Sequence, residues 1–316
     1  AHRAGKPFFT VVWFGSPHEP YSGLPSDLAL YDDLPAKYNQ KTVRLTSNKT
    51  GGQTKRPQGE VLRERYAEIT AMDRAIGNLR THLAVEGLRD NTLLFYCGDN
   101  GTSGDGSLVT PHRGVKGQVY DGGVLVPGLI EWPARIPQPR STKVRATTSD
   151  LLPTLCALVG QPLPNRPIDG TDLIPLIDRK MKERPVPLFF WIYKGHSARD
   201  INHEPYIDPK LQEGTTPLVK LSAGKATRDF KNFIHPSISE DDYLGPRTII
   251  DGDMKLVVHD QKRGESRFEL FDLQSDPGEK NNIIDQQPAT AKELQARLLQ
   301  WQKSVLNSLT GADYRK

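Results

Sequence analysis

A short apolar run that ends abruptly in polar residues constrains this chain more than any other stretch. Residues 92–97 read Thr-Leu-Leu-Phe-Tyr-Cys, which is typical of a buried strand, and Gly98-Asp99-Asn100-Gly101 follows at once. Ligands of α/β sheets bind beyond the carboxyl ends of the strands, and Asp and Asn supply the hard oxygen donors that Ca²⁺ or Mg²⁺ prefers. The run therefore predicts a cation site at a strand end, with Asp99 and Asn100 among its ligands.

A basic, glycine-bearing loop follows the same run. Lys116 lies within residues 113–117, Arg-Gly-Val-Lys-Gly, where it can present an ammonium group to an anion. Two ligands for a hard cation and a lysine at the same strand end indicate chemistry on an anionic ester.

A second apolar run, residues 7–15 (PFFTVVWFG), predicts another fully buried strand, and Ser16-Pro17-His18-Glu19-Pro20 follows it. The two prolines predict a stiff, extended loop around His18. Two interpretations of His18 stay open: a loop histidine bonded to a nearby carbonyl, or a functional residue at a second strand end.

The rest of the chain predicts an α/β protein in two parts. Apolar spacings of three and four residues predict a core-facing helix over 59–87 that ends at Gly87, and apolar runs predict a strand over 124–132 and helices over 151–159 and 173–177. A charged, proline-bearing segment over 178–187 then marks a boundary. Beyond it we expect a strand at 187–193, an antiparallel meander of three strands at 247–250, 255–259 and 267–273, and a closing helix from 288 to 306. The predicted domains are 1–182 and 183–316.

Composition excludes several classes of protein. The net charge of +4 over 316 residues is small, so we expect no nucleic-acid partner, and no run of eighteen apolar residues predicts a membrane span. Cys97 and Cys156 both lie in apolar runs, which favours buried free thiols, although a disulfide between them stays open.

Seven motifs in a fixed order resemble those of the formylglycine-dependent sulfatases, a family of the alkaline-phosphatase-like superfamily. They are Pro17-His18-Glu19-Pro20, Gly98-Asp99-Asn100-Gly101, the loop over 113–117, Tyr120-Asp121-Gly122-Gly123, Ser149-Asp150-Leu151-Leu152-Pro153 with Asp169-Gly170, Gly252-Asp253-Met254-Lys255-Leu256, and Glu269-Leu270-Phe271-Asp272-Leu273 with Asp276-Pro277-Gly278-Glu279. The resemblance implies a mixed, mostly parallel sheet flanked by helices, followed by a smaller α+β subdomain with an antiparallel sheet and a terminal helix.

The resemblance also implies roles for individual residues. Asp99 and Asn100 match two ligands of the family's Ca²⁺, Lys116 matches the lysine that binds sulfate oxygens, and His18 matches the histidine beside the leaving group. The family's nucleophile is a formylglycine made in a Cys/Ser-x-Pro/Ala-Ser-Arg motif, and it forms a covalent sulfo-enzyme. Neither cysteine of this chain lies in such a motif. We therefore expect a carboxyl-terminal portion of a sulfatase that is inactive alone, with the nucleophile and the remaining metal ligands upstream.

The expected substrate is a sulfated small molecule or glycan, because of the family's habit and a basic stretch at Lys41, Arg44, Lys49, Lys55 and Arg56. Arg113 and His196 are further candidates for substrate binding. Two alternatives stay open: a phosphoesterase of the same superfamily, and a non-catalytic carbohydrate-binding relative. From the resemblance alone, we expect a periplasmic or secreted protein.

Overall fold

The computed structural model describes residues 5–47, 49–104, 110–193, 221–222, 225–226, 237–260 and 265–314. The chain forms two compact units. The first comprises Ala1–Tyr96, Thr102–Thr110 and Pro127–Pro139, and the second comprises Cys97–Gly101, Pro111–Val126 and Arg140–Lys316. The predicted boundary near residue 182 divides the chain into two continuous domains, whereas these units are discontinuous in sequence, and that boundary stays a prediction.

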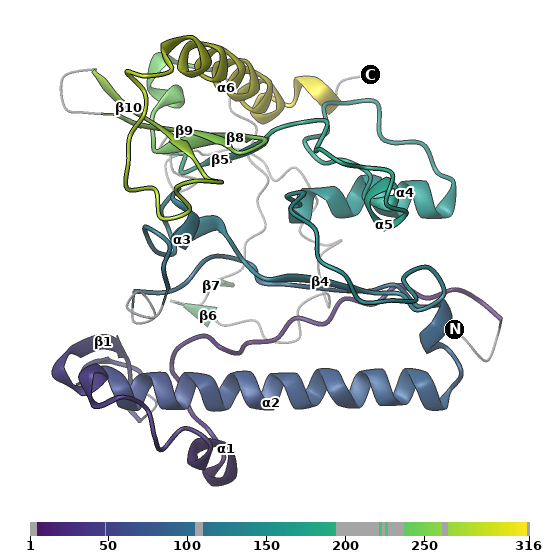
Figure 1. Ribbon diagram of the computed structural model, residues 1–316, viewed down its shortest axis with the longest axis vertical. Helices are drawn as coiled ribbons and strands as arrows, with labels where there is room; N and C mark the ends of the chain where they lie inside the picture. Colours follow the sequence, from purple (N-terminus) through teal and green to yellow (C-terminus); the bar gives the residue numbers. More distant parts are fainter. Residues whose placement is uncertain are drawn as a thin grey trace. The chain divides into compact units, whose positions relative to one another are not determined.

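The first unit is built on one long helix, α2, which spans Gln58–Val85 and confirms the predicted helix (Figure 1). It ends as the sequence predicts: Gly87 has a φ of 68°, and the amide of Leu88 donates back to the carbonyl of Leu83 at 2.8 Å. The other elements are α1 (Pro25–Ala29), η2 (Ala36–Gln40), β1 (Thr42–Thr46), β2 (Gln53–Pro57), η3 (Arg89–Asn91), β3 (Leu94–Cys97) and β4 (Gly128–Glu131).

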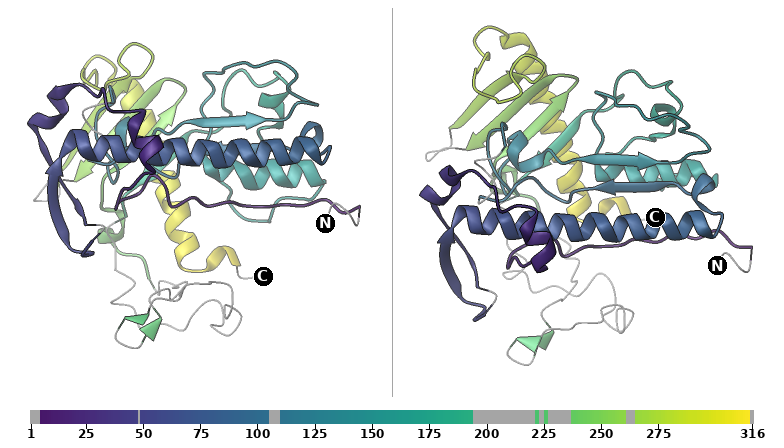
Figure 2. Two further views of the ribbon diagram at one scale, coloured as in Figure 1. Left: turned by 90° about the horizontal axis from the view of Figure 1, so that it is seen from below. Right: turned by 60° about the horizontal axis from the view of Figure 1, so that its bottom comes forward.

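The β1–β2 hairpin packs at the amino-terminal end of α2 (Figure 2). There Tyr21, Leu45 and Val61 form a small core. The predicted apolar stripe of α2 is only partly buried, because Leu62 and Leu83 are buried whereas Ile69 and Leu79 are exposed. β3 pairs with β4, which confirms two of the predicted strands as a two-stranded sheet.

The prediction of a buried strand over residues 7–15 is wrong. These residues form no strand, and Phe9 and Trp13 are 72% and 91% exposed. A strand made only of apolar residues is buried when neighbours cover both of its faces. No strand of the described ranges pairs with this segment, so its sequence alone does not bury it.

The second unit contains a four-stranded antiparallel sheet with strand order β10-β9-β8-β5 (Figure 1). The last three strands in chain order confirm the predicted meander, and the strand near residues 187–193 pairs at its edge. Its strands are β5 (Leu188–Trp191), β8 (Arg247–Asp251), β9 (Met254–Asp260) and β10 (Ser266–Asp272), and its terminal helix is α6 (Pro288–Leu309). The other elements are α3 (Asp121–Val124), η4 (Thr148–Asp150), α4 (Leu151–Val159), α5 (Ile174–Ile177), β6 (Leu221–Ser222), β7 (Lys225–Ala226), η6 (Glu240–Tyr243) and η7 (Ala312–Tyr314).

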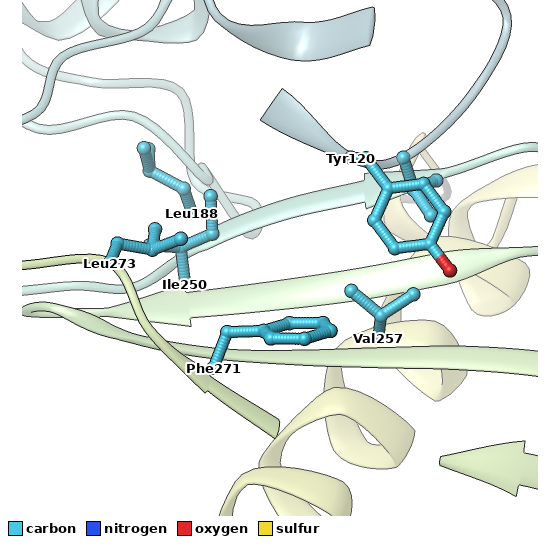
Figure 3. Close-up of a cluster of buried hydrophobic side chains, with 7 residues drawn as sticks. Tyr120, Leu188, Ile250, Val257, Phe271 and Leu273 are labelled. Atoms are coloured by element: carbon cyan, nitrogen blue, oxygen red, sulfur yellow. The ribbon is translucent and has the colours of Figure 1, made fainter. Parts of the chain in front are cut away.

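Both faces of this sheet are covered, because successive side chains of a strand point to opposite faces. One face packs on α6 through Ile249, Leu256, Val258, Leu270, Ala291, Leu294 and Leu298. The other face packs on Val119 and Tyr120, the residues just before α3, through Leu188, Ile250, Val257, Phe271 and Leu273 (Figure 3). The carboxyl-terminal sheet therefore supports the segment that carries α3.

The two cysteines and the lengths of the helices were also subjects of the sequence analysis. Cys97 and Cys156 are free, half-buried thiols. None of the helices in the described ranges combines the length and apolar character that crossing a membrane requires.

Candidate functional site

The short helix α3 joins two of the predicted site segments through main-chain hydrogen bonds. The amide of Gly101, just after Asp99 and Asn100, donates to the carbonyl of Gly123 at 2.9 Å. The amide of Gly122 donates to the carbonyl of Arg113 at 2.7 Å, at the start of the loop that carries Lys116. The candidate metal ligands and the candidate anion-binding lysine are thus attached to the same four-residue helix.

This attachment depends on the absence of side chains at two positions. A Cβ atom on Gly101 would lie 2.3 Å from the carbonyl oxygen of Gly122, and one on Gly122 would lie 2.1 Å from the carbonyl oxygen of Gly114. Both contacts are with main-chain atoms, which cannot rotate away. The glycines of the Gly-Asp-Asn-Gly and Tyr-Asp-Gly-Gly motifs therefore allow the two segments to approach α3 closely.

Asp99 and Asn100 present oxygen atoms that suit a hard cation. The carboxylate of Asp99 is exposed and accepts no hydrogen bond from the described part of the chain. The side-chain Nδ2 of Asn100 donates to the carbonyl of Gly101 at 2.9 Å, which leaves its Oδ1 available. The described residues contain no group of three or more His, Cys, Asp or Glu side chains placed to hold a metal ion. The pair therefore fits a share of a Ca²⁺ site and does not complete one.

Lys116 lies in a loop that is closed by its own contacts. The amide of Gln118 donates to the carbonyl of Val115 at 3.0 Å, and the Gln118 side-chain Oε1 accepts from the amide of Val115 at 3.2 Å. Lys116 is exposed, and its ammonium group forms no ion pair with any described residue. An unpaired ammonium on a braced loop is suited to binding an anion.

His18 belongs to the first compact unit. Its ring Nδ1 lies 2.7 Å from the carbonyl oxygen of Glu19, which can only accept, so Nδ1 carries the proton and Nε2 is left for another partner. The carboxylate of Glu19 accepts from the amide of Thr46 at 2.9 Å, which ties the loop to β1. The contact with a nearby carbonyl agrees with the simpler interpretation of His18 and leaves Nε2 free for the functional one.

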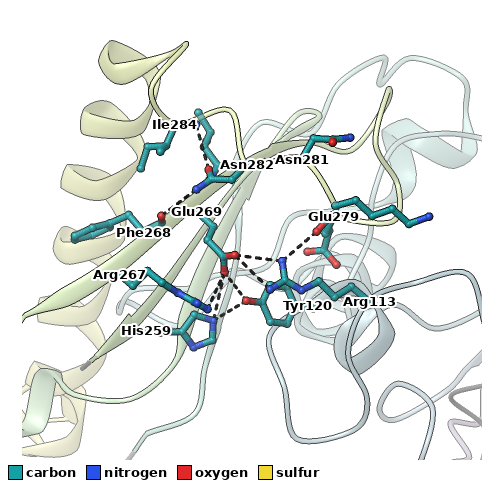
Figure 4. A network of polar contacts seen from close by, with 12 residues as sticks. Arg113, Tyr120, His259, Arg267, Phe268, Glu269, Glu279, Asn281, Asn282 and Ile284 are labelled. Atoms are coloured by element: carbon teal, nitrogen blue, oxygen red, sulfur yellow. Dashed lines mark hydrogen bonds and ion pairs between the residues drawn. The ribbon is translucent and has the colours of Figure 1, made fainter. Parts of the chain in front are cut away.

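Arg113, a candidate for substrate binding, contacts the carboxyl-terminal sheet instead of extending into solvent (Figure 4). Its guanidinium donates to Glu269 Oε1 at 3.2 Å and to the carbonyl of Glu279 at 3.0 Å, and it lies 3.9 Å from the centre of the Tyr120 ring. These contacts fix the start of the Lys116 loop. His196, the other candidate, lies outside the described residues.

Sequence reasoning did not identify a buried charge cluster beneath α3. The Nζ atom of Lys255, on β9, lies 2.6 Å from Asp121 Oδ1 and 2.8 Å from Glu279 Oε1. The side chains of Lys255 and Glu279 are 0% exposed. One signal was available in the sequence, since Lys255 is a lone charge in the apolar stretch Met254–Val258. A lysine buried in a strand needs a partner, because an unpaired buried charge is costly.

Because of the phenol of Tyr120, we expect the protein to lose stability at alkaline pH. Burial, followed by the hydrogen bond to Glu269, raises the pKa of Tyr120 to about 12. Since an unfolded tyrosine has a pKa of about 10, the folded state holds this proton more tightly, and its stability falls as pH rises from about 10 to about 12. Urea unfolding between pH 8 and pH 12 should show a steeper loss above pH 10 for the wild type than for Tyr120→Phe. Parallel curves would contradict the assignment.

Comparisons with known proteins show the family to which the chain belongs. The sulfatase family model matches residues 1–161. Human arylsulfatase A is 32% identical over 246 residues, which cover 76% of this chain and 43% of that protein. The ulvan-active sulfatase of Formosa agariphila is 30% identical over 66% of this chain and 40% of that protein. The chain thus spans less than half the length of these two relatives.

A solved structure shows that the likeness extends to the fold. It is a Bacteroides thetaiotaomicron protein described under the metabolism of multiple glycosaminoglycans, with a TM-score of 0.60 and 21% identity over 98% of this chain and 57% of that chain. The order of the motifs, the match of the family model to half of the chain and this likeness agree. The chain belongs to the sulfatase family and has its alkaline-phosphatase-like fold.

Proposed function

We propose that the protein carrying this chain is a sulfuric ester hydrolase that acts on sulfated carbohydrate. Membership of the sulfatase family supports the reaction class. The observation that carries the proposal is the attachment of two functional segments to α3: the oxygen donors of Asp99 and Asn100 through Gly101, and the loop of Lys116 through Arg113. Two ligands for a metal ion and the ammonium of Lys116, both attached to one short helix, suit a substrate with a charged sulfate group.

In the proposed mechanism each residue has one role. Asp99 and Asn100 hold part of a Ca²⁺ site, and the ion, when bound, would neutralise charge that develops on the sulfate oxygens. The ammonium of Lys116 binds a sulfate oxygen and the bridging oxygen of the ester. The ring of His18 is held by its Nδ1 contact, and its Nε2, when protonated, gives a proton to the departing alcohol.

The nucleophile in this proposal is a formylglycine outside the 316 residues, because no Cys/Ser-x-Pro/Ala-Ser-Arg motif lies within them. We expect this chain by itself to release no sulfate from an aryl sulfate above the rate of a buffer blank. The full open reading frame, expressed with the modifying enzyme, should be active. Turnover by the 316-residue chain alone would contradict a nucleophile outside it.

The metal role of Asp99 has its own test. In the full-length protein Asp99→Ala should weaken Ca²⁺ binding and turnover together, since it removes a charged ligand. Isothermal titration with Ca²⁺ and a sulfate-release assay measure the two effects. Asp169→Ala, in a motif that is not assigned to the metal, is the matched control. A variant that loses activity at unchanged Ca²⁺ affinity would show that Asp99 is not a ligand.

A substrate panel decides between this proposal and its alternatives. Sulfated monosaccharides and oligosaccharides should release sulfate, and phosphate or phosphonate esters of the same leaving groups should react more slowly. A preference for the phosphorus esters would make the protein a phosphoesterase. Glycan binding without release of sulfate by the full-length protein would make it a carbohydrate-binding relative.

Four further predictions belong to this proposal. They are the domains 1–182 and 183–316, the mostly parallel sheet of the first domain, substrate contacts of Arg113 and His196, and export to the periplasm or the medium. A structure of the full-length protein with a sulfated sugar tests the first three, and cell fractionation tests the fourth.

A further inference from the structure

A fully buried charge cluster lies where the carboxyl-terminal sheet meets α3. Lys255 points from β9 to the same face of the sheet as Val257, because alternate residues of a strand share a face. Its ammonium group contacts the carboxylates of both Asp121 and Glu279. Asp121 is the first residue of α3. The sheet therefore contacts α3 through an ion pair as well as through apolar packing.

Glu279 adds a second connection to the same helix. Its Oε2 accepts from the main-chain amide of Asp121 at 2.7 Å, while its Oε1 contacts Lys255. Glu279 has a φ of 52°, in the left-handed region that favours glycine. A glutamate kept in this conformation and fully buried indicates that its side chain is required at this place.

The turn that carries Glu279 also holds the loop of Lys116. The main-chain carbonyl of Glu279 accepts from Arg113, and Glu269 on β10 accepts from Arg113 and from Tyr120 (Figure 4). The charges in this region balance: Arg113, Lys255 and Arg267 face Asp121, Glu269 and Glu279. One turn and two strands thus fix both α3 and the start of the loop.

We propose that Lys255 and Glu279 are positioning residues for the candidate site. They fix the first residue of α3. Because main-chain bonds connect α3 to Gly101 and Arg113, fixing α3 also fixes the segments that carry Asp99, Asn100 and Lys116. Neither residue touches the substrate. The proposal rests on the proposed function only where it calls this arrangement catalytic; the mechanical connection stands on the contacts alone.

Another buried ion pair of the same unit supplies a matched control. Asp150 is fully buried, pairs with Arg184 at 2.7 Å, and accepts from the amides of Thr147 and Thr171. Like Glu279 it is a buried carboxylate with a cationic partner and a main-chain donor. It forms no hydrogen bond or ion pair with the described residues of 99–101, 113–118 or 121–124.

Amide hydrogen exchange in the full-length protein tests the connection. The reporters are the amides of Gly101 and Gly122, which donate to the carbonyls of Gly123 and Arg113 and not to Glu279. Glu279→Ala should raise their exchange rates by about tenfold or more through local opening, with a smaller rise for the isosteric Glu279→Gln. Asp150→Ala, studied at conditions of equal global stability, should leave both rates within about twofold of the wild type. Equal increases in all variants, or none at the two reporters, would overturn the proposal.

Steady-state kinetics separate this proposal from the proposed function. If the full-length wild type releases sulfate, Glu279→Gln should lower kcat by about tenfold with a smaller change in KM, and Asp150→Ala should keep the wild-type kcat below its melting temperature. A kcat that is unchanged in Glu279→Gln would overturn the catalytic part of the proposal. If the wild type releases no sulfate from any ester, the proposed function fails, and the exchange experiment still decides whether Glu279 positions the two segments.

Discussion

Replacing Lys255 by methionine should destabilise the protein by about 3–5 kcal/mol, because it leaves two buried carboxylates without their cation. The ammonium lies 2.6 Å from Asp121 and 2.8 Å from Glu279, and the Lys255 and Glu279 side chains are 0% exposed. Methionine has a similar length and keeps the apolar stem in place. Urea unfolding followed by circular dichroism measures the change in the free energy of unfolding.

Two further variants show whether the lost charge causes this effect. Lys292→Met makes the same change at an exposed position of α6 and should alter stability by less than about 0.5 kcal/mol. Adding Glu279→Gln to Lys255→Met removes one of the unpaired carboxylates and should recover part of the loss. A cost for Lys255→Met no larger than that for Lys292→Met would show that the cluster contributes nothing.

Replacing Lys116 by alanine should lower turnover of the full-length protein by about 10²–10³-fold, as removal of one fixed donor to a developing anion does. The ammonium has no ion-pair partner in the described residues, so stability should hardly change. Calcium content should stay at the wild-type value, because Asp99 and Asn100, and not Lys116, are the proposed metal ligands. A sulfate-release assay and metal analysis of the same preparation measure both quantities.

Lys143→Ala is the control for this experiment, since it removes another exposed lysine of the second unit. Its turnover should equal that of the wild type. If Lys116→Ala lost calcium as well as activity, the division of roles between the lysine and the Asp99–Asn100 pair would be wrong.

The carboxyl-terminal sheet and helix were predictable because their patterns are local. In β8, β9 and β10 short apolar strands are separated by turn residues, and the 288–309 helix has regular apolar spacing, so each element is determined by a few neighbouring residues. Residues 7–15 show the limit of this reasoning. Their composition fits a strand buried on both faces, but burial depends on neighbours that a local pattern does not specify.

The candidate site also has a part that local sequence predicts and a part that it does not. Asp99, Asn100 and Lys116 were identified from residue types after a strand and in a glycine-bearing loop. The support beneath them was not, because Lys255 and Asp121 are separated by 134 positions in the chain. The lone lysine in an apolar strand shows that a partner must exist, but only the fold shows which carboxylate it is.

The main-chain contacts of Gly101 and Gly122 have a consequence for protein engineering. The spacing between the Asp99–Asn100 pair and the Lys116 loop is set by main-chain bonds to α3, and the buried side chains of Lys255 and Glu279 hold α3 in place. A combinatorial library that leaves these two glycines, Gln118, Lys255 and Glu279 unchanged and varies exposed positions such as Leu125 can therefore explore new leaving groups without disturbing that spacing. Variants from such a library should differ in substrate preference and share one melting temperature.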